Sequence, residues 1–480
     1  MMQDNTSLRV HAKRPSTGPA FTSRKLIELL QFNLGAIPNQ FCLTAVRSSK
    51  LGAGRRKRMK FSNFGRATLA AVCSLGAAAT FTACGPNGYN NTVDYVFVTN
   101  AKNNPGQINA YLADARSGAL TQVTGSPFNS GGTDPVGLVT SPNFENLYVV
   151  NRESNSVVQF TIGDNAQIAM KQSYTTPGSL PNALAINAAG TLLFVTDTFA
   201  PNATTGSGVL VVYPIASDGS LGSPVANGAL PYFPLSTAGT DVLSPTAVNS
   251  VTQNPVNGTG ANPSFVYVIS QNTTTGLGDI SAFSVASGGA LTAVPCSAST
   301  SICDTTGNGT FNAGTSPNAV ASTPRGLFLY VTDSVNNQLI SYTVQSTGQI
   351  IPNTDGPTRT DVFPDSVVVD PRGQYVYVAN FTANDISAYT INIATGYPTG
   401  VAAAGAYSTG TGPTCVFVEP ALGRYVYTTN FLDNTVSGLN LNPNTGTLAG
   451  VQNSPFIAAG QPTCVSAIPH GNHPISAPLS

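Results

Sequence analysis

One short stretch of the chain combines residue types suited to acid–base chemistry and anion binding. Arg152 and Glu153 are adjacent and directly follow Asn151. A guanidinium group can hold a carboxylate or phosphate through two parallel hydrogen bonds, and a carboxylate can act as a general base toward water. With Asp197 as the alternative base, Arg152, Glu153 and Asp197 are the candidate catalytic residues for hydrolysis of an ester-type carbonyl. The competing interpretation, which the sequence favours, is a solvated surface ion pair.

Asn151 and Asp197 each close one copy of a repeated phrase. The phrase is an apolar run ending in a small polar residue, and its seven copies are YVFVTN (Tyr95–Asn100), NLYVVN (Asn146–Asn151), LLFVTD (Leu192–Asp197), FVYVIS (Phe265–Ser270), FLYVTD (Phe328–Asp333), YVYVAN (Tyr375–Asn380) and YVYTTN (Tyr425–Asn430). Four of the six intervals between copies are 46 to 51 residues long. Such an interval is close to the length of a four-stranded propeller blade.

A second phrase begins at a proline and continues into small and β-branched residues. It occurs at Pro135, Pro181, Pro245, Pro317, Pro364, Pro413 and Pro462. The first apolar phrase has no proline phrase before it, and the last proline phrase has no apolar phrase after it. We therefore predict an all-β fold: a seven-bladed β-propeller of four-stranded antiparallel blades, closed by the C-terminal inner strand in a 3+1 clasp. Two stacked sandwiches, the alternative, would not leave an orphan strand at each end.

Apolar strands that end in V-T-N at this period resemble the YVTN-repeat branch of the seven-bladed lactonase family, which includes propeller-type 6-phosphogluconolactonases. The resemblance covers residues 93–470. It implies the propeller fold and, for activity, the opening of a sugar or organic-acid lactone. The family's lactonizing members use a histidine with acidic and arginine partners. The histidines of this chain are His11, His470 and His473, so that histidine has no counterpart between positions 12 and 469.

Polar residues should collect on the upper face of the predicted ring, where the proline strands begin and the apolar strands end. The candidate binding residues are Asn100, Asn151, Asp333, Asp365 and Asn380. The competing interpretation is structural, because Asn and Asp at a strand end usually hydrogen-bond to the backbone of the next turn.

Two longer repeat intervals locate insertions in the third and fourth units. The inserted segments are 200–208, 226–243, 254–263 and 272–278. Long loops in a compact domain often carry function, so we expect them to form the wall of any ligand pocket.

The first 84 residues differ sharply in charge from the rest. Of the 21 basic residues, 13 lie there with only two acids, which leaves 8 basic and 19 acidic residues for the body. An acidic body should repel polyanions, so nucleic-acid binding is not expected.

This basic leader resembles a bacterial lipoprotein signal. Positive charges precede a short apolar run of small residues and then Cys84, the expected lipidation site. An ordinary secretory signal is the alternative. The expected organisation is a basic extension outside the mature protein at 1–58, a signal peptide at 59–83, a tether at 84–92, the propeller at 93–470 and a tail at 471–480.

The remaining cysteines suit an oxidising compartment. Cys296 and Cys303 enclose a hexapeptide rich in Ser and Thr, which predicts a disulfide across that loop. Cys415 and Cys464 occupy the same place in consecutive units. Free thiols are favoured there over a second disulfide, because neighbouring inner strands can exceed disulfide reach. No metal site and no cofactor are expected.

Two functions of different class remain open. The favoured one is an exported, membrane-anchored lipoprotein of the bacterial cell envelope, periplasmic or surface-facing and monomeric, that binds a glycan, a small lactone or a protein ligand through its upper face. The alternative is a lactonase-like hydrolase, so whether the protein is an enzyme stays undecided. Convergence of Arg152, Glu153, Asp197 and Asp333 in one pocket would favour the enzyme.

Overall fold

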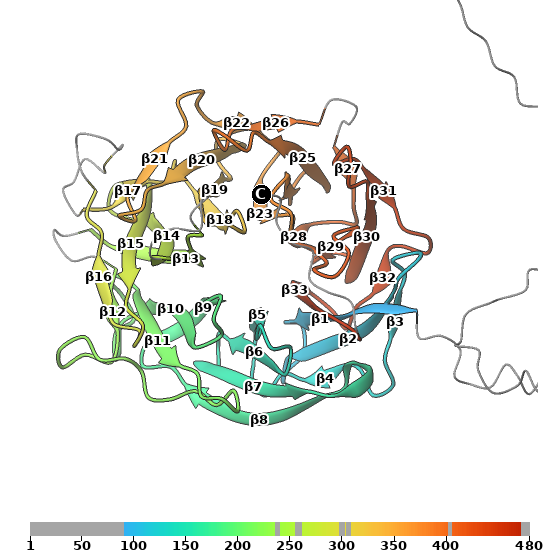
Figure 1. The fold of residues 1–480 in the computed structure, drawn as a ribbon. Helices are drawn as coiled ribbons and strands as arrows, with labels where there is room; N and C mark the ends of the chain where they lie inside the picture. The colour runs from blue at the N-terminus through green and yellow to red at the C-terminus, as the bar shows by residue number, and fades with distance from the viewer. Residues whose placement is uncertain are drawn as a thin grey trace, which may run out of the picture. The chain divides into compact units, whose positions relative to one another are not determined.

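Seven antiparallel sheets follow one another around a central axis in the computed structural model, and each contributes one innermost strand (Figure 1). The structure describes residues 91–235, 241–254, 262–296, 303, 309–401 and 406–471. The predicted extension, signal peptide and lipidated Cys84 lie outside these ranges. The first strand, β1, starts at Thr92, one residue before the expected start of the propeller.

Each blade is a meander from the axis outward. Blade 1 consists of β33(Pro462–Pro469), β1(Thr92–Asn100), β2(Gln107–Asp114), β3(Leu120–Gln122) and β4(Phe128–Asn129). Blade 2 consists of β5(Pro135–Thr140), β6(Asn146–Asn151), β7(Ser156–Ile162) and β8(Ile168–Thr175), with a single 3₁₀ turn, η1(Asp164–Ala166), before β8. Blade 3 consists of β9(Ser179–Ile186), β10(Leu192–Phe199), β11(Val209–Pro214) and β12(Phe233–Pro234).

The other four blades repeat this order. Blade 4 consists of β13(Leu243–Thr252), β14(Ser264–Asn272), β15(Gly278–Val285), β16(Leu291–Ala293) and β17(Phe311–Asn312). Blade 5 consists of β18(Pro317–Ser322), β19(Phe328–Asp333), β20(Gln338–Val344), β21(Ile350–Pro352) and β22(Thr358–Arg359). Blade 6 consists of β23(Pro364–Val369), β24(Tyr375–Asn380), β25(Asp385–Ile391), β26(Pro398–Gly400) and β27(Tyr407–Ser408). Blade 7 consists of β28(Pro413–Val418), β29(Tyr425–Asn430), β30(Thr435–Leu441), β31(Leu448–Gly450) and β32(Phe456–Ile457).

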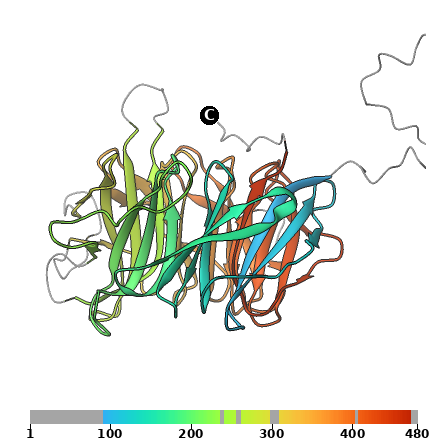
Figure 2. The same ribbon diagram turned by 90° about the horizontal axis from the view of Figure 1, so that it is seen from below.

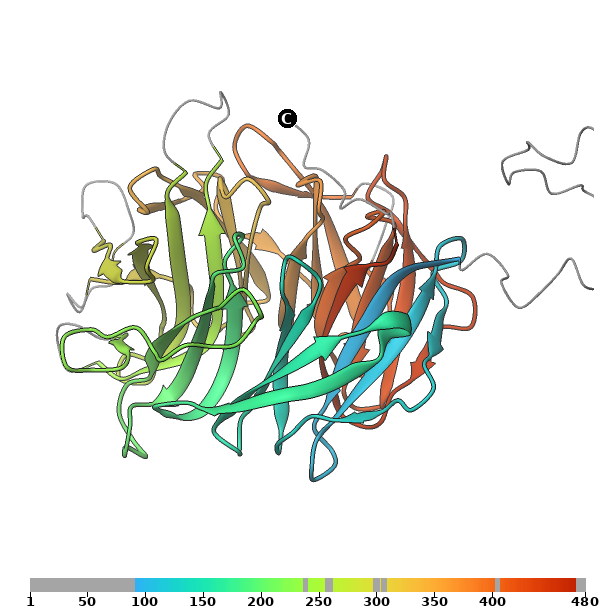
Figure 3. The ribbon, with the colours of Figure 1, turned by 60° about the horizontal axis from the view of Figure 1, so that its bottom comes forward.

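The apolar phrase is the second strand of every blade, and both of its faces are covered. In β24, for example, all six residues are buried. Neighbouring blades stack face to face (Figures 2 and 3), so one hydrophobic cluster joins Tyr377 and Ile386 of blade 6 to Leu439 of blade 7. A strand buried on both faces needs a continuous apolar run instead of alternation, which accounts for sequences such as YVYVAN.

The tyrosine in the middle of this phrase ties one blade to the next. The Tyr377 hydroxyl donates a 3.0 Å hydrogen bond to the carbonyl of Gly446 in the outer turn of the following blade. The equivalent pairs are Tyr148–Gly219, Tyr267–Gly348, Tyr330–Gly396 and Tyr427–Gly118. Gly446 has φ of +72°, and a Cβ there would lie 2.4 Å from the Tyr375 ring, so the turn requires glycine. The tyrosine of the apolar phrase and the glycine of the outer turn therefore recur together, because they form the same hydrogen bond between successive blades.

The ring closes through its last strand. β1 pairs with β2 on one side and with β33 on the other, with Val98 opposite Val465. This strand order confirms the predicted seven-bladed propeller with a 3+1 clasp. The Tyr427–Gly118 bond, at 2.9 Å, joins blade 7 to blade 1 by the same contact used elsewhere in the ring.

Candidate functional site

A β-bulge follows the proline of each inner strand and leaves one residue per blade unpaired on the strand nearest the axis. In blade 6, Pro364 pairs with Asn380 and Ser366 pairs with Ala379, so the register skips Asp365. The register shifts at the same place in the other six blades. A bulge leaves its extra residue unpaired and redirects that side chain. The residues so placed, which we call the channel ring, are Val136, Asn182, Thr246, Asn318, Asp365, Thr414 and Thr463.

Five members of the channel ring line a pocket of about 720 Å³ at the upper mouth of the axis. Loop residues from blades 1, 2 and 7 complete the wall. The lining residues are Ala101, Lys102, Asn103, Asn104, Thr133, Asp134, Val136, Arg152, Glu153, Asn318, Asp365, Thr414, Phe431, Gln461 and Thr463. Two cationic side chains thus face this space from blades 1 and 2, while Asn318 and Asp365 face it from blades 5 and 6.

Asp365 is the titratable group most changed by this setting. It is partly exposed, and its Oδ1 accepts a 2.9 Å hydrogen bond from Asn318 Nδ2. Burial raises the pKa of Asp365 to about 6, even though the Asn318 bond acts in the opposite direction. A carboxyl group with such a pKa exchanges protons near neutral pH, as a general base or acid must.

Arg152 is held at the rim by its neighbour across the turn. Its Nε lies 2.8 Å from Asp134 Oδ2, and its backbone N–H donates to the Asp134 carbonyl. Nearly half of the Arg152 side chain, 48%, stays exposed. One edge of the guanidinium is thus occupied, and the rest of the group remains available to an anion in the pocket.

The structure corrects the expectation for the seven residues that end the second strands. We call them the end ring; its members are Asn100, Asn151, Asp197, Ser270, Asp333, Asn380 and Asn430, and each is at most 1% exposed. They lie at the upper face but turn into the blades. Six of them hydrogen-bond there to the turn before the inner strand or to the third strand. Asp333, for example, accepts hydrogen bonds from the backbone N–H groups of Thr315 and Ser316.

The candidate binding residues Asn100, Asn151, Asp333 and Asn380 therefore do not open into the mouth, and the candidate base Asp197 does not reach it. Of the predicted site residues, Arg152, Glu153 and Asp365 come together. Lys102, Thr414, Thr463 and Phe431 were missed. For the two threonines a sequence signal existed, because they directly follow the inner-strand prolines.

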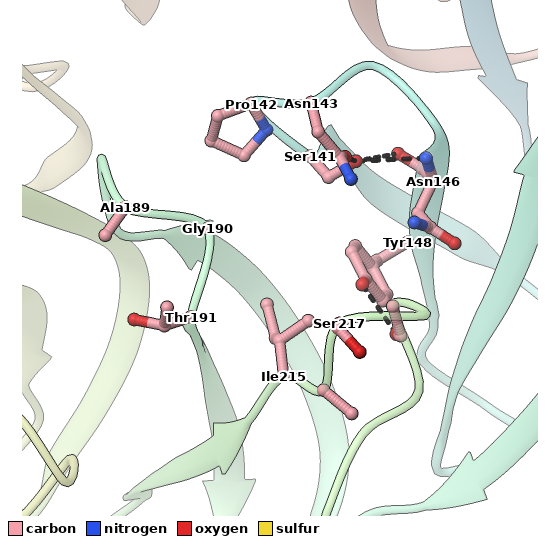
Figure 4. Close-up of a pocket in the computed structure, with 12 residues that line it drawn as sticks. Ser141, Pro142, Asn143, Asn146, Tyr148, Ala189, Gly190, Thr191, Ile215 and Ser217 are labelled. Atoms are coloured by element: carbon pink, nitrogen blue, oxygen red, sulfur yellow. Dashed lines mark hydrogen bonds between the residues drawn. The ribbon is translucent and has the colours of Figure 1, made fainter.

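The described residues of the insertions do not form the expected pocket wall. Within the described parts of 200–208, 226–243 and 272–278, no residue lines the mouth pocket. A second pocket of about 350 Å³ lies on the opposite, lower face between blades 2 and 3 (Figure 4). Its polar groups are engaged with each other: the Asn146 N–H donates to Ser141 Oγ, and the Tyr148 hydroxyl donates to the Gly219 carbonyl. This pocket has no charged side chain, so the mouth pocket is the better candidate site.

The other predicted features have simple structural settings. Cys296 and Cys303 form a disulfide, and Cys415 and Cys464 are free thiols. His470 stacks on the Tyr95 ring, while His473 lies outside the described residues. Within the described ranges no group of three or more His, Cys, Asp or Glu side chains could hold a metal ion. The same ranges contain no helix long and apolar enough to cross a membrane.

Comparison with known proteins places this architecture in a family. A family model described as a lactonase, seven-bladed β-propeller, matches residues 107–207 and 280–418, which together make up half of the chain. The chain belongs to the lactonase family of seven-bladed β-propellers. A search of curated proteins found no match.

Solved structures agree on the fold of this lactonase-family propeller. A candidate 6-phosphogluconolactonase from Bacteroides fragilis is 17% identical with a TM-score of 0.61, over 79% of this chain and 99% of its own. The periplasmic gluconolactonase PpgL from Pseudomonas aeruginosa is 15% identical with a TM-score of 0.57, over 78% of this chain and 99% of its own. At these identities the similarity shows the shared fold only.

Proposed function

We propose that this lactonase-family propeller binds a small anionic ligand with several hydroxyl groups, such as a sugar acid or its lactone, in the mouth pocket. One observation carries the proposal. Arg152 and Lys102 line the pocket from blades 2 and 1, and Asn318, Asp365, Thr414 and Thr463 of the channel ring line it with them. Cations can hold a carboxylate or phosphate, and amide, hydroxyl and carboxyl groups can bond to the hydroxyls of a sugar.

Lactone hydrolysis is the second candidate, and the pKa of Asp365 favours it. Above a pKa of about 6, Asp365 is ionised and can take a proton from water attacking the lactone carbonyl. Arg152 or Lys102 would stabilise the developing oxyanion. Glu153 also lines the pocket and is the competing base. Asp197 is withdrawn as a base because it is fully buried.

The setting we propose is the bacterial cell envelope, with the mature chain anchored by lipid at Cys84 and acting as a monomer. The leader sequence supports this placement. A Cys84→Ser variant expressed in a bacterial host should move from the membrane fraction to the soluble fraction. An unchanged distribution would reject the lipid anchor and leave the ligand site untouched.

Calorimetry with purified protein tests the binding function. D-Gluconate and 6-phosphogluconate should bind, while D-glucose, which lacks the anionic group, should bind at least about tenfold more weakly. The matched control is Asp355→Asn, an exposed acid in an outer turn of blade 5, which should bind like the wild type. If neither anion binds, the proposed ligand class is wrong.

Hydrolysis of D-glucono-δ-lactone, measured against the spontaneous rate in buffer, tests the second candidate. A rate above background that falls in Asp365→Asn and persists in Glu153→Ala assigns the base to Asp365. The reverse pattern assigns it to Glu153. Binding of gluconate without any rate above background rejects the hydrolase and retains the binding protein.

A further inference from the structure

Two thiol groups lie side by side where the ring closes. Cys415 is the third residue of β28 in blade 7, and Cys464 is the third residue of β33, the closing strand of blade 1. Both sulfurs lie within 4.0 Å of the same atom, the carbonyl oxygen of Val465, at 4.0 Å from Cys415 Sγ and 3.9 Å from Cys464 Sγ. Both side chains are partly exposed and are free thiols in the structure.

The hydrogen bonds of this position do not require sulfur. The Val465 N–H donates to Cys415 Sγ at 3.3 Å, which ties blade 7 to the closing strand. One blade earlier, the Val416 N–H makes the same bond to Ser366 Oγ at 3.1 Å. A hydroxyl group therefore serves the contact between blades equally well, and the paired thiols offer a chemistry that the contact itself does not use.

We propose that Cys415 and Cys464 form a reversible disulfide that covalently joins blade 7 to the C-terminal closing strand. In the structure, β33 is held to β1 by strand pairing and by a 2.8 Å hydrogen bond between the Thr99 and Thr463 hydroxyl groups. A bond between these cysteines would fix β33 covalently against β28 of blade 7, in the position from which β33 pairs with β1. This inference is independent of the proposed ligand and of lactone hydrolysis.

The reaction is thiol–disulfide exchange with a small disulfide such as oxidised glutathione. The Cys464 thiolate attacks one glutathione sulfur, forms a mixed disulfide and releases the first glutathione. Cys415 then loses its proton and attacks Cys464 Sγ, which releases the second glutathione. Two cysteines are oxidised, one disulfide is reduced to two thiols, and the two cysteine protons end on the two glutathione sulfurs.

The local environment suits this order of events. A hydrogen bond from Cys415 lowers the pKa of the Cys464 thiol, and the same bond raises the pKa of Cys415. Cys464 is thus the thiol more readily ionised, and the thiolate is the attacking species in exchange.

Peptide mapping tests the bond directly. The full chain is reduced, treated with oxidised glutathione in the folded state, alkylated in denaturant and digested. We expect a peptide pair linked through Cys415 and Cys464 that disappears on reduction. Recovery of both cysteines in alkylated form overturns the proposal, and this result needs no variant to fold.

Thermal unfolding tests the effect on closure, in a Cys296→Ser/Cys303→Ser background that removes the other described disulfide. Oxidation should raise Tm by about 5 °C, because the crosslink closes a loop of almost fifty residues. The added substitution Cys415→Ser, which copies Ser366, should abolish the rise while leaving the reduced Tm nearly unchanged. A linked peptide without a rise in Tm would overturn its role in closure.

Discussion

The end ring and the channel ring lie at the same end of two neighbouring strands in each blade, yet their side chains have different surroundings. In blade 6, Asn380 of the end ring pairs with Pro364, and Asp365 of the channel ring is the very next residue. Asn380 is fully buried and bonds to Asp385 and Ser387, whereas Asp365 faces the pocket. Strand pairing turns one polar side chain into the blade, and a bulge turns its neighbour toward the axis.

The two rings also differ in composition. Six of the seven end-ring residues are Asn or Asp, whereas the channel ring contains Val, Asn, Thr and Asp. Six of the end-ring side chains hydrogen-bond either to the turn before the inner strand or to the third strand of the blade, so this position tolerates little variety. Five members of the channel ring line the pocket, and the residue type at this position differs from blade to blade. Repetition therefore marks the scaffold, and deviation from it marks the candidate site.

The largest expected effect comes from breaking the end ring. Asp333→Ala leaves the backbone N–H groups of Thr315 and Ser316 without their acceptor, and the free energy of unfolding should fall by about 4 kcal/mol. Urea denaturation measures this loss. The exposed Asp355→Ala should change the value by less than about 0.5 kcal/mol. Equal effects of the two substitutions would contradict the structural role.

The second largest effect is expected from a channel-ring substitution that lowers catalytic activity without destabilising the fold. If the protein hydrolyses a lactone, Asp365→Asn should lower kcat about 100-fold, because it removes the base, with Tm within about 3 °C of the wild type. A drop in Tm large enough to explain the lost activity would show that Asp365 belongs to the scaffold after all.

Asp365 also gives the binding and hydrolysis functions opposite dependence on pH. Its pKa is raised to about 6, so it is neutral below that pH and negative above it. Binding of an anionic ligand should therefore weaken as pH rises through 6, whereas hydrolysis that uses Asp365 as base should increase over the same range. Calorimetry and rate measurements from pH 5 to pH 8 separate the two, and Asp365→Asn should flatten both profiles.

A smaller effect is expected at the rim of the pocket. Arg152→Ala should weaken binding of 6-phosphogluconate about tenfold through loss of one charge-assisted contact. The stability of this variant should change by less than about 1 kcal/mol, because the Arg152 side of its ion pair with Asp134 is nearly half exposed. Arg116→Ala, on an exposed outer turn of blade 1, is the charge-matched control. If Arg116→Ala weakens binding as much as Arg152→Ala does, the net charge of the protein attracts the anion and the pocket does not.

The smallest expected effect comes from Asp197 of the end ring. Burial raises the pKa of Asp197 to about 7, above its ordinary value in an unfolded chain. The neutral form therefore stabilises the fold fully below about pH 4, and this contribution is lost as pH rises through 7. Asp197→Asn copies four other end-ring positions and should gain about 1 kcal/mol at pH 8 relative to the wild type. Parallel stability profiles for the two proteins from pH 4 to pH 8 would refute this.

The sequence was sufficient to predict the features that recur in every blade. Seven apolar runs, seven prolines and an orphan strand at each end were sufficient for the blade number and the clasp, because each blade must bury its second strand against the next. At the site the prediction was only partly right: Arg152, Glu153 and Asp365 line the pocket, but period and residue type do not report which polar side chains the strand pairing buries. Asn151 and Arg152 are adjacent, but one is buried and the other rims the pocket. Lys102 was overlooked because the pocket combines blades 5, 6, 7, 1 and 2, and blades 7 and 1 become neighbours only when the ring closes.

The closing strand has a consequence for how the protein is made. Blade 1 contains both the first propeller strand to leave the ribosome, β1, and the last, β33. Blades 2 to 7 draw all their strands from one continuous segment each and can form as synthesis proceeds, but blade 1 must wait until the final residues of the propeller emerge. A chain that stopped just before Pro462 would thus have six finished blades and a ring that stays open.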